Sequence, residues 1–197
     1  MDHHAVNDEA LDTIFRSART QNKWQDKPVS NALLMAVYDL MRMGPTSANC
    51  SPARFVFLTT AAAKERLAVL ASPGNAPKIR QASATAIIGY DLDFAQKLPQ
   101  LFPHDQTAKT WFTDPKVEET TAFRNGTLQG GYFIIAARAL GLDCGPMSGF
   151  NNTKVDEEFF AGTRIKSNFI CSVGHGDPAG LFGRSPRLSF DEACKIV

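Results

Sequence analysis

The chain has 197 residues and an apolar fraction of 44%, which suits one globular domain over residues 1–197 with a sizeable core. Its 21 basic and 20 acidic residues leave a net charge of +1, which argues against a nucleic-acid-binding surface. No apolar run approaches the roughly 20 residues that span a bilayer, and the acidic first residues lack the apolar stretch of a secretory signal. We therefore expect a cytoplasmic protein without membrane contact.

The cysteines and histidines are scattered. The four cysteines form no CxxC pair, so a disulfide framework or a zinc site is not expected. His3 and His4 are expected to be solvated, and His104 and His175 have no carboxylate or thiol at metal-ligand spacing. The sequence predicts no metal site.

Local signals in the first half of the chain predict helices and two strands. Asn7 or Asp8 can cap a first helix that runs to about Ala18, and Ser30 can cap a second helix that Gly44 and Pro45 end. The later elements are a β-prone strand at 54–59, a helix at 60–70, a short basic helix at 78–81 and a strand at 85–90.

The second half begins with an irregular stretch, 91–115, whose aromatic residues Phe102, Trp111 and Phe112 favour either a lid over a site or dimer packing. A long helix at 116–140 follows, apolar nearly all round. The remaining predicted elements are an extended segment at 142–147, a helix capped by Asn152 or Thr153 that ends near 161, and a strand at 168–173. Helices outnumber strands without regular alternation, which predicts an α+β fold.

Five segments have residues suited to binding a phosphate-bearing flat ligand, although each also has an ordinary structural explanation. Arg19-Thr20-Gln21-Asn22 follows the first helix, and Arg184 and Arg187 lie in the tail; both groups can bind a phosphate. The loop 44–52 is dense in hydroxyls and an amide between two prolines, as turns also are. The other two are 75–78, with a lysine after a turn, and 145–150, whose glycines expose backbone N–H groups.

The order of the motifs ARTQNKW, GPTSANCSP, GNAPK, LGLDCGPMSGF and RSPRLSFDEA resembles the FMN-dependent nitroreductase family from about Arg19 to the C-terminus. The segments LPQLFPH, EETTAFRN and PRLSFDEAC are most similar to its malonic semialdehyde reductase (RutE/HadB-like) branch of pyrimidine degradation. The resemblance implies a nitroreductase-like fold, with a mostly antiparallel sheet flanked by helices. It also implies an intertwined homodimer with FMN at the subunit interface.

The resemblance also implies roles for individual residues. It places the FMN phosphate on Arg19, Thr20, Asn22, Arg184 and Arg187. It places three groups of residues around the flavin ring. The partner's loop supplies Pro45, Thr46, Ser47, Asn49 and Ser51, and the pair at the pyrimidine edge of the ring is Asn75 and Lys78. The turn over the ring is formed by Pro146, Met147, Ser148 and Gly149. Three positions depart from the family pattern: Asn22 replaces a basic residue, Ser51 a glutamine and Ser148 a glutamate.

The implied reaction is ping-pong, with a hydride passing from NADH or NADPH through flavin N5 to a second substrate. Lys78 is expected to stabilise the reduced flavin, and Ser148 to tune the field near N5. Malonic semialdehyde is the first substrate hypothesis, and nitroaromatics or quinones are the alternative. Arg54, Arg124, His104 and Ser148 are candidates for the proton donor or the carboxylate-binding group. A flavin-binding protein without catalysis is a third hypothesis.

Overall fold

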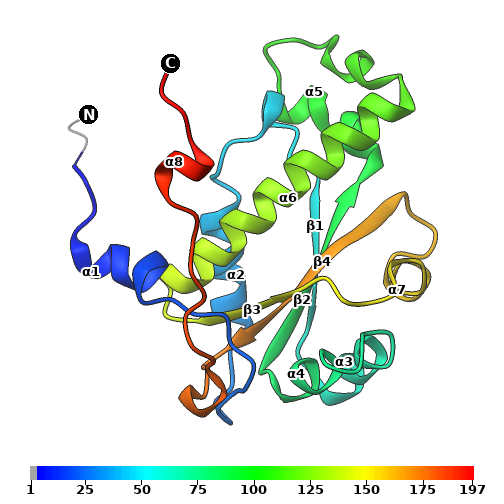
Figure 1. The fold of residues 1–197 in the computed structure, drawn as a ribbon. Coiled ribbons are helices and arrows are strands. Elements are labelled where there is room, and N and C mark those ends of the chain that lie inside the picture. The colour runs from blue at the N-terminus through cyan, green and yellow to red at the C-terminus, as the bar shows by residue number, and fades with distance from the viewer. Residues whose placement is uncertain (1–3) are drawn as a thin grey trace.

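The computed structural model describes residues 4–197, so the expectation for His3 lies outside it. At its centre is a four-stranded antiparallel sheet in the order β1-β2-β4-β3 (Figure 1). The strands are β1 Ala53–Leu58, β2 Ala84–Asp91, β3 Asp143–Met147 and β4 Ile165–Gly174. The expected α+β fold with an antiparallel sheet is therefore confirmed. The segment expected only to be extended is the edge strand β3, in register with β4 from Asp143↔Gly174 to Met147↔Ile170.

Both faces of the sheet are covered by helices, and the alternation of side chains along β2 shows this. Ala86 and Ile88 point into one apolar cluster and Ile87 into another, as the period of two along a strand requires. All three residues are fully buried. A strand buried on both faces needs apolar residues at successive positions, which is why β2 reads as a continuous apolar run rather than an alternating one.

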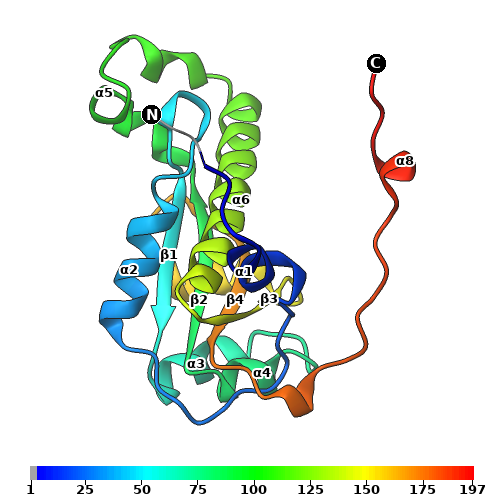
Figure 2. The same cartoon turned by 90° about the vertical axis from the view of Figure 1, so that its left-hand side faces the viewer.

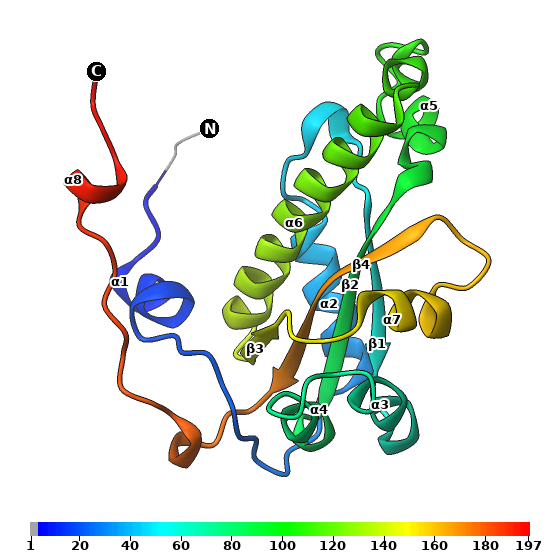
Figure 3. The same ribbon diagram turned by 45° about the vertical axis from the view of Figure 1, so that its right-hand side comes forward.

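The long helices α2 (Asn31–Met41) and α6 (Pro115–Ala139) cover the first face (Figures 1 and 3). Val37 and Phe133 are fully buried in this layer, and the Phe133 ring lies 5.4 Å from the ring of Phe55 on β1, centroid to centroid. The predicted cap of α2 is confirmed, because the Ser30 side chain accepts from the Leu33 N–H at 3.1 Å.

The second face carries three shorter helices, α3 (Ala61–Ala68), α4 (Ala76–Gln81) and α7 (Asn152–Phe159). Leu67, Ile79 and Val155 are fully buried in the cluster that these helices form with the sheet. The predicted cap of α7 was wrong by at least one residue. Asn151 caps it, since its side chain accepts from the Lys154 N–H at 3.0 Å, and Asn152 is already helical.

The stretch 91–115 is not irregular, as was expected, but contains short helices. Two 3-10 helices cover 92–97 and 108–112, with α5 (Leu98–Leu101) between them. They pack on a third apolar cluster that includes Cys50, Phe94 and Leu98. Three prolines prevented a long helix but left room for single turns.

The N-terminal segment meets the start of the tail where Arg184 donates to the carbonyls of Arg16 and Ala18, and the tail beyond it runs away from the body of the molecule (Figure 2). Helix α1 (Asp8–Leu11) is capped by Asn7 and continues as a wider turn to Arg16, two residues short of the expected end. The tail from 181 onward is mostly exposed, and its short helix α8 (Phe190–Ala193) was not predicted. None of the helices within residues 4–197 is both long enough and apolar enough to cross a membrane.

Candidate functional site

The segment 19–22 runs beside the edge strand β3. Thr20 forms a parallel bridge with Cys144, and the Gln21 N–H donates to the Cys144 carbonyl at 3.0 Å. The close approach depends on Gly145, because a Cβ there would lie 2.6 Å from the Gln21 carbonyl oxygen. The edge strand thus positions Arg19, Thr20 and Asn22 on one side of the sheet.

The tail joins this segment through its arginines. The Arg184 guanidinium donates to the carbonyl oxygens of Arg16 at 2.8 Å and Ala18 at 3.2 Å. In return, Arg19 donates to the carbonyl of Phe182. Two groups separated by more than 160 residues in the sequence are thereby brought together, as the phosphate hypothesis requires.

A cavity of about 660 Å³ lies between the segment 15–22 and the start of the tail at 182–187. Its lining residues are mostly polar and include five arginines and no carboxylate: Phe15, Arg16, Ala18, Arg19, Thr20, Asn22, Arg138, Phe182, Gly183, Arg184, Ser185 and Arg187. Within residues 4–197, Arg16 is the one arginine of the five that pairs with carboxylates, those of Asp8 and Asp12. Four uncompensated guanidinium groups around one cavity fit a phosphate dianion.

Arg138 strengthens that fit. One guanidinium nitrogen donates to the Ile14 carbonyl at 3.0 Å, whereas its Nε is buried without a hydrogen-bond partner in the part of the chain that the structure describes. A buried donor without an acceptor is costly, and a bound anion would remove that cost. The residues present therefore fit the phosphate end of a mononucleotide.

The candidate segments 75–78 and 145–150 meet beyond the end of β3. The Gly149 carbonyl accepts from the Ser72 N–H at 2.9 Å and from the Asn75 side-chain amide at 3.2 Å. A Cβ on Gly149 would lie 2.8 Å from both the Asn75 amide nitrogen and the Ser72 hydroxyl, so a larger residue there would displace these side chains. Lys78, in the first turn of α4, is half-buried and has no ion pair within residues 4–197, while Ser148 is exposed. Pro146 and Met147 are the last residues of β3.

The loop 44–52 lies elsewhere. It leads into β1, the edge strand opposite β3, so one chain does not bring Pro45, Thr46, Ser47, Asn49 and Ser51 to the arginine cavity. Instead, Asn49 and Ser51 line a second cavity of about 420 Å³ with Arg42, Arg54 and Lys97. Four of the five predicted segments thus gather along the β3 edge, and the fifth does not.

The four candidates for proton donor or carboxylate binding are scattered. Arg54 lines the second cavity, where its guanidinium pairs with Asp91 at 2.7 Å. Arg124 and His104 are exposed and line neither cavity. Ser148 follows directly on β3. Of the four, Ser148 lies at the β3 edge, on the same side as Lys78. Arg54 lies beside the loop 44–52.

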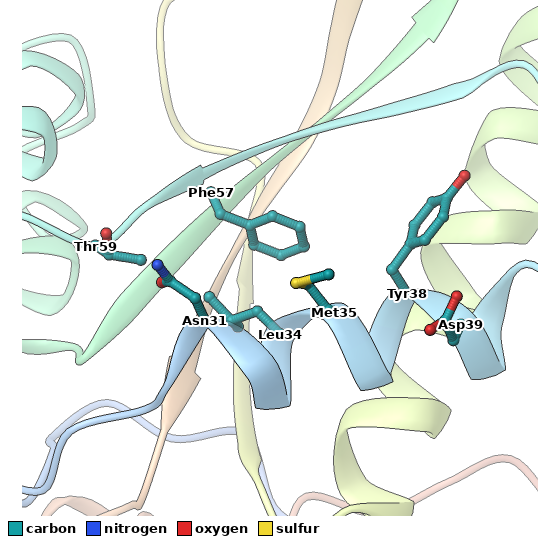
Figure 4. A pocket seen from close by; sticks show the side chains of 7 residues that line it. All are labelled: Asn31, Leu34, Met35, Tyr38, Asp39, Phe57 and Thr59. Carbon is teal, nitrogen blue, oxygen red and sulfur yellow. The ribbon is translucent and has the colours of Figure 1, made fainter.

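A third cavity, of about 380 Å³, is an apolar groove between α2 and β1 (Figure 4). Leu34, Met35 and Tyr38 line it from the helix, and Phe57 from the strand. None of the predicted site residues lines it. Met35 and Tyr38 are 68% and 45% exposed, which is unusual for apolar side chains grouped on one face.

Sequence reasoning missed several residues that the structure places at these sites. Arg138 lies on the otherwise apolar end of α6 and lines the arginine cavity. Asn125 and Gln129 are 5% and 4% exposed, on the side of α6 that faces the loop. A signal existed, because polar residues inside an apolar helix need partners when buried.

The protein has an α+β fold with an arginine-lined cavity beside its sheet edge, and the residues of that cavity suit an anionic ligand. Its sequence matches the profile of the nitroreductase family over residues 15–175. That match covers most of the chain, so the chain belongs to the nitroreductase family.

Individual relatives agree with this assignment. "Putative NADH dehydrogenase/NAD(P)H nitroreductase Reut_A1586" of Cupriavidus pinatubonensis is 59% identical, over 96% of this chain and 98% of its own. "Putative NADH dehydrogenase/NAD(P)H nitroreductase HadB" of Ralstonia pickettii is 57% identical, over 95% and 97%. Among solved structures, a putative nitroreductase in complex with FMN from Exiguobacterium sibiricum 255-15 superposes with a TM-score of 0.84 over 100% of both chains, at 18% identity. The structural likeness is one of fold.

Proposed function

We propose that the chain is an FMN-dependent NAD(P)H oxidoreductase. The observation that carries the proposal is the arginine cavity beside the start of β3, with Asn75 and Gly149 in contact beyond the other end of the same strand. The names of the relatives, which include NAD(P)H nitroreductase, and the FMN complex of the structural neighbour support it. When bound, FMN supplies the redox chemistry, because it takes up a hydride from a nicotinamide and passes it on.

The residues of this chain then have distinct tasks. Arg19, Thr20, Asn22, Arg184 and Arg187 hold the phosphate, and Arg138 adds a buried donor. Lys78 and Asn75 hold the ring edge where reduction leaves negative charge, and the Lys78 ammonium stabilises that charge. The turn 146–149 offers backbone N–H groups beside the ring. The neutral Ser148 contributes no charge of its own to the local field.

The proposal includes a homodimer in which the loop 44–52 of one copy completes the site of the other. The separation of the loop from the β3 edge supports it, since one chain alone does not assemble all five segments. Exposed apolar side chains on and just after α2 and along the tail also support a covered surface, namely Met35, Tyr38, Leu40, Met43, Phe182, Leu188, Phe190 and Ile196. A closed dimer buries such patches on both copies at once.

A complementation experiment tests the shared site. Lys78→Ala and Asn49→Ala are each expected to lower flavin reduction strongly while leaving the dimer intact. When the two variants are co-expressed in equal amounts with different tags, half of the dimers are heterodimers. One of the two sites in each heterodimer is unaltered, so about a quarter of all sites regain full activity. Activity that stays at the average of the two parent variants would show that both residues act in the same chain. An unchanged reduction rate in Lys78→Ala would remove Lys78 from the reaction.

For the second substrate we propose malonic semialdehyde, reduced to 3-hydroxypropionate in pyrimidine degradation. The ground for this choice is the resemblance of the sequence motifs to the RutE/HadB-like branch, and a relative named HadB is 57% identical. The second cavity supports a substrate with a carboxylate, because Lys97 there has no ion pair within residues 4–197 and Arg54 is fixed by Asp91. Reduction of a nitroaromatic or a quinone is the alternative, which the names of both relatives favour.

The direct test is a visible spectrum of the purified protein, followed by anaerobic titration. We expect a yellow protein whose flavin band bleaches with NADH or NADPH and returns with malonic semialdehyde. Return of the colour with nitroaromatics or quinones but not with the aldehyde would replace the substrate and keep the enzyme class. Bound flavin that stays oxidised in excess NADH and NADPH would show a binding protein without catalysis.

A further inference from the structure

The loop 44–52 adopts a backbone conformation that its residues disfavour. Ala48, Asn49 and Ser51 have φ values of +48°, +50° and +39°, in the left-handed region, and Cys50 between them has −68°. Asparagine tolerates this region, whereas alanine and serine pay a steric cost there. Three such residues within four positions require strong support from the surroundings, or the loop would relax to another shape.

Support comes from one stripe of α6. Asn125, Gln129 and Tyr132 are spaced i, i+4, i+7 and therefore lie on one face of the helix. The Asn125 side-chain oxygen accepts from the Ser47 N–H at 2.9 Å, and the Gln129 oxygen accepts from the Ala53 N–H at 2.8 Å. The Tyr132 hydroxyl donates to the Pro45 carbonyl at 3.0 Å.

These contacts are placed at both ends of the strained stretch. Pro45 and Ser47 come before it, and Ala53 follows it after Pro52. The Asn125 amide nitrogen donates to the Thr121 carbonyl at 2.9 Å, which fixes the amide so that its oxygen faces the loop. Inside the loop, the Thr46 hydroxyl accepts from the Ser51 N–H at 3.1 Å. Releasing the loop would leave these buried amide acceptors unpaired. Because an unpaired buried acceptor is costly, the contacts hold the loop in place.

We propose that Asn125, Gln129 and Tyr132 are positioning residues that hold the loop 44–52 in its ligand-binding shape before any ligand arrives. The inference rests on the proposed function, in which this loop contacts the flavin ring. A preformed loop binds without first losing conformational entropy, so part of the affinity for FMN depends on the residues that hold the loop in place. The helix stripe thus sets how the loop presents its hydroxyls and the Asn49 amide.

The test compares two substitutions at one position. Gln129→Met removes the acceptor at nearly constant volume, and Gln129→Glu keeps an oxygen in its place. We expect Gln129→Met to speed amide exchange of the loop in the FMN-free protein at least about tenfold and to weaken the Kd for FMN by about tenfold. We expect Gln129→Glu to restore both toward wild type. Tyr132→Phe, which removes one hydroxyl, should move both quantities in the same direction as Gln129→Met, and it serves if Gln129→Met fails to fold.

Ser83→Ala is the matched control, because it also removes a side-chain acceptor from a backbone N–H, that of Val29 at 2.6 Å. In Ser83→Ala, the rate of amide exchange in the loop 44–52 and the Kd for FMN should stay at the wild-type values. Faster loop exchange with an unchanged Kd in Gln129→Met and Tyr132→Phe would overturn the positioning role alone. A wild-type protein that binds no FMN would overturn the proposed function and this inference together.

Discussion

Replacing Phe133 with alanine is expected to lower the free energy of unfolding by about 3–5 kcal/mol. Phe133 is fully buried between α6 and the sheet, and its ring centroid lies 5.4 Å from that of Phe55 and 6.0 Å from that of Phe57. The substitution removes apolar burial and leaves a cavity that rigid neighbours on β1 cannot fill. Urea unfolding followed by circular dichroism measures the effect as a lower midpoint at an unchanged slope.

Two further variants calibrate this result. Phe133→Leu leaves a smaller cavity and should fall between wild type and Phe133→Ala. Val69→Ala removes a side chain that is 64% exposed and should change stability by no more than about 0.5 kcal/mol. A Phe133→Ala variant as stable as Val69→Ala would contradict the packing of α6 against the sheet.

The second large effect is expected at the arginine cavity. Arg184→Ala should weaken the Kd for FMN by about 10- to 100-fold, because a charge-assisted bond to a phosphate is lost and the tail is released from Arg16 and Ala18. Flavin fluorescence titration measures the Kd. Arg184→Lys should recover part of the affinity, since a lysine keeps the charge but not the forked donor geometry.

Salt provides an independent check on Arg184. Binding of FMN to wild type should weaken as ionic strength rises, and the dependence should be smaller in Arg184→Ala, which has one charge fewer to screen. Arg66→Ala is the control, because Arg66 pairs with Glu158 on the face that carries α3 and α7 and lines no part of the arginine cavity. An Arg184→Ala variant that binds FMN as tightly as wild type would remove the tail from the phosphate site.

The two predictions examine different parts of the molecule, and their outcomes are separable. Phe133 lies in the core, so its loss lowers stability and should change the Kd for FMN little under conditions where the protein stays folded. Arg184 lies on the exposed tail, so its loss should change the Kd while the unfolding midpoint of the ligand-free protein stays nearly constant. The fold and the site are thus supported by different residues.

Local sequence patterns determined most of the elements by themselves. Examples are the Ser30 cap, the buried strand around Ile87 and the helix of 116–140. Each depends on residues close to one another in the sequence, and the structure confirms each element within a few residues. The number and order of the predicted helices and strands also predicted the α+β class. The arginines at 19, 184 and 187 were candidates by residue type and were predicted as phosphate ligands by the family resemblance; their role stays a prediction, although the structure now places them around one cavity.

Tertiary structure decided what depends on distant contacts. Cys144 and Gly145 form an edge strand because β4 and the segment 19–22 pair with it, whereas the local sequence favours only an extended segment. Arg138, Asn125 and Gln129 look alike as polar residues in a helix, and only packing shows which cavity or loop each one faces. The separation of the loop 44–52 from the β3 edge follows from strand order, which periodicity does not encode. Sequence specified the local conformations; the pairing of strands at long range specified the site.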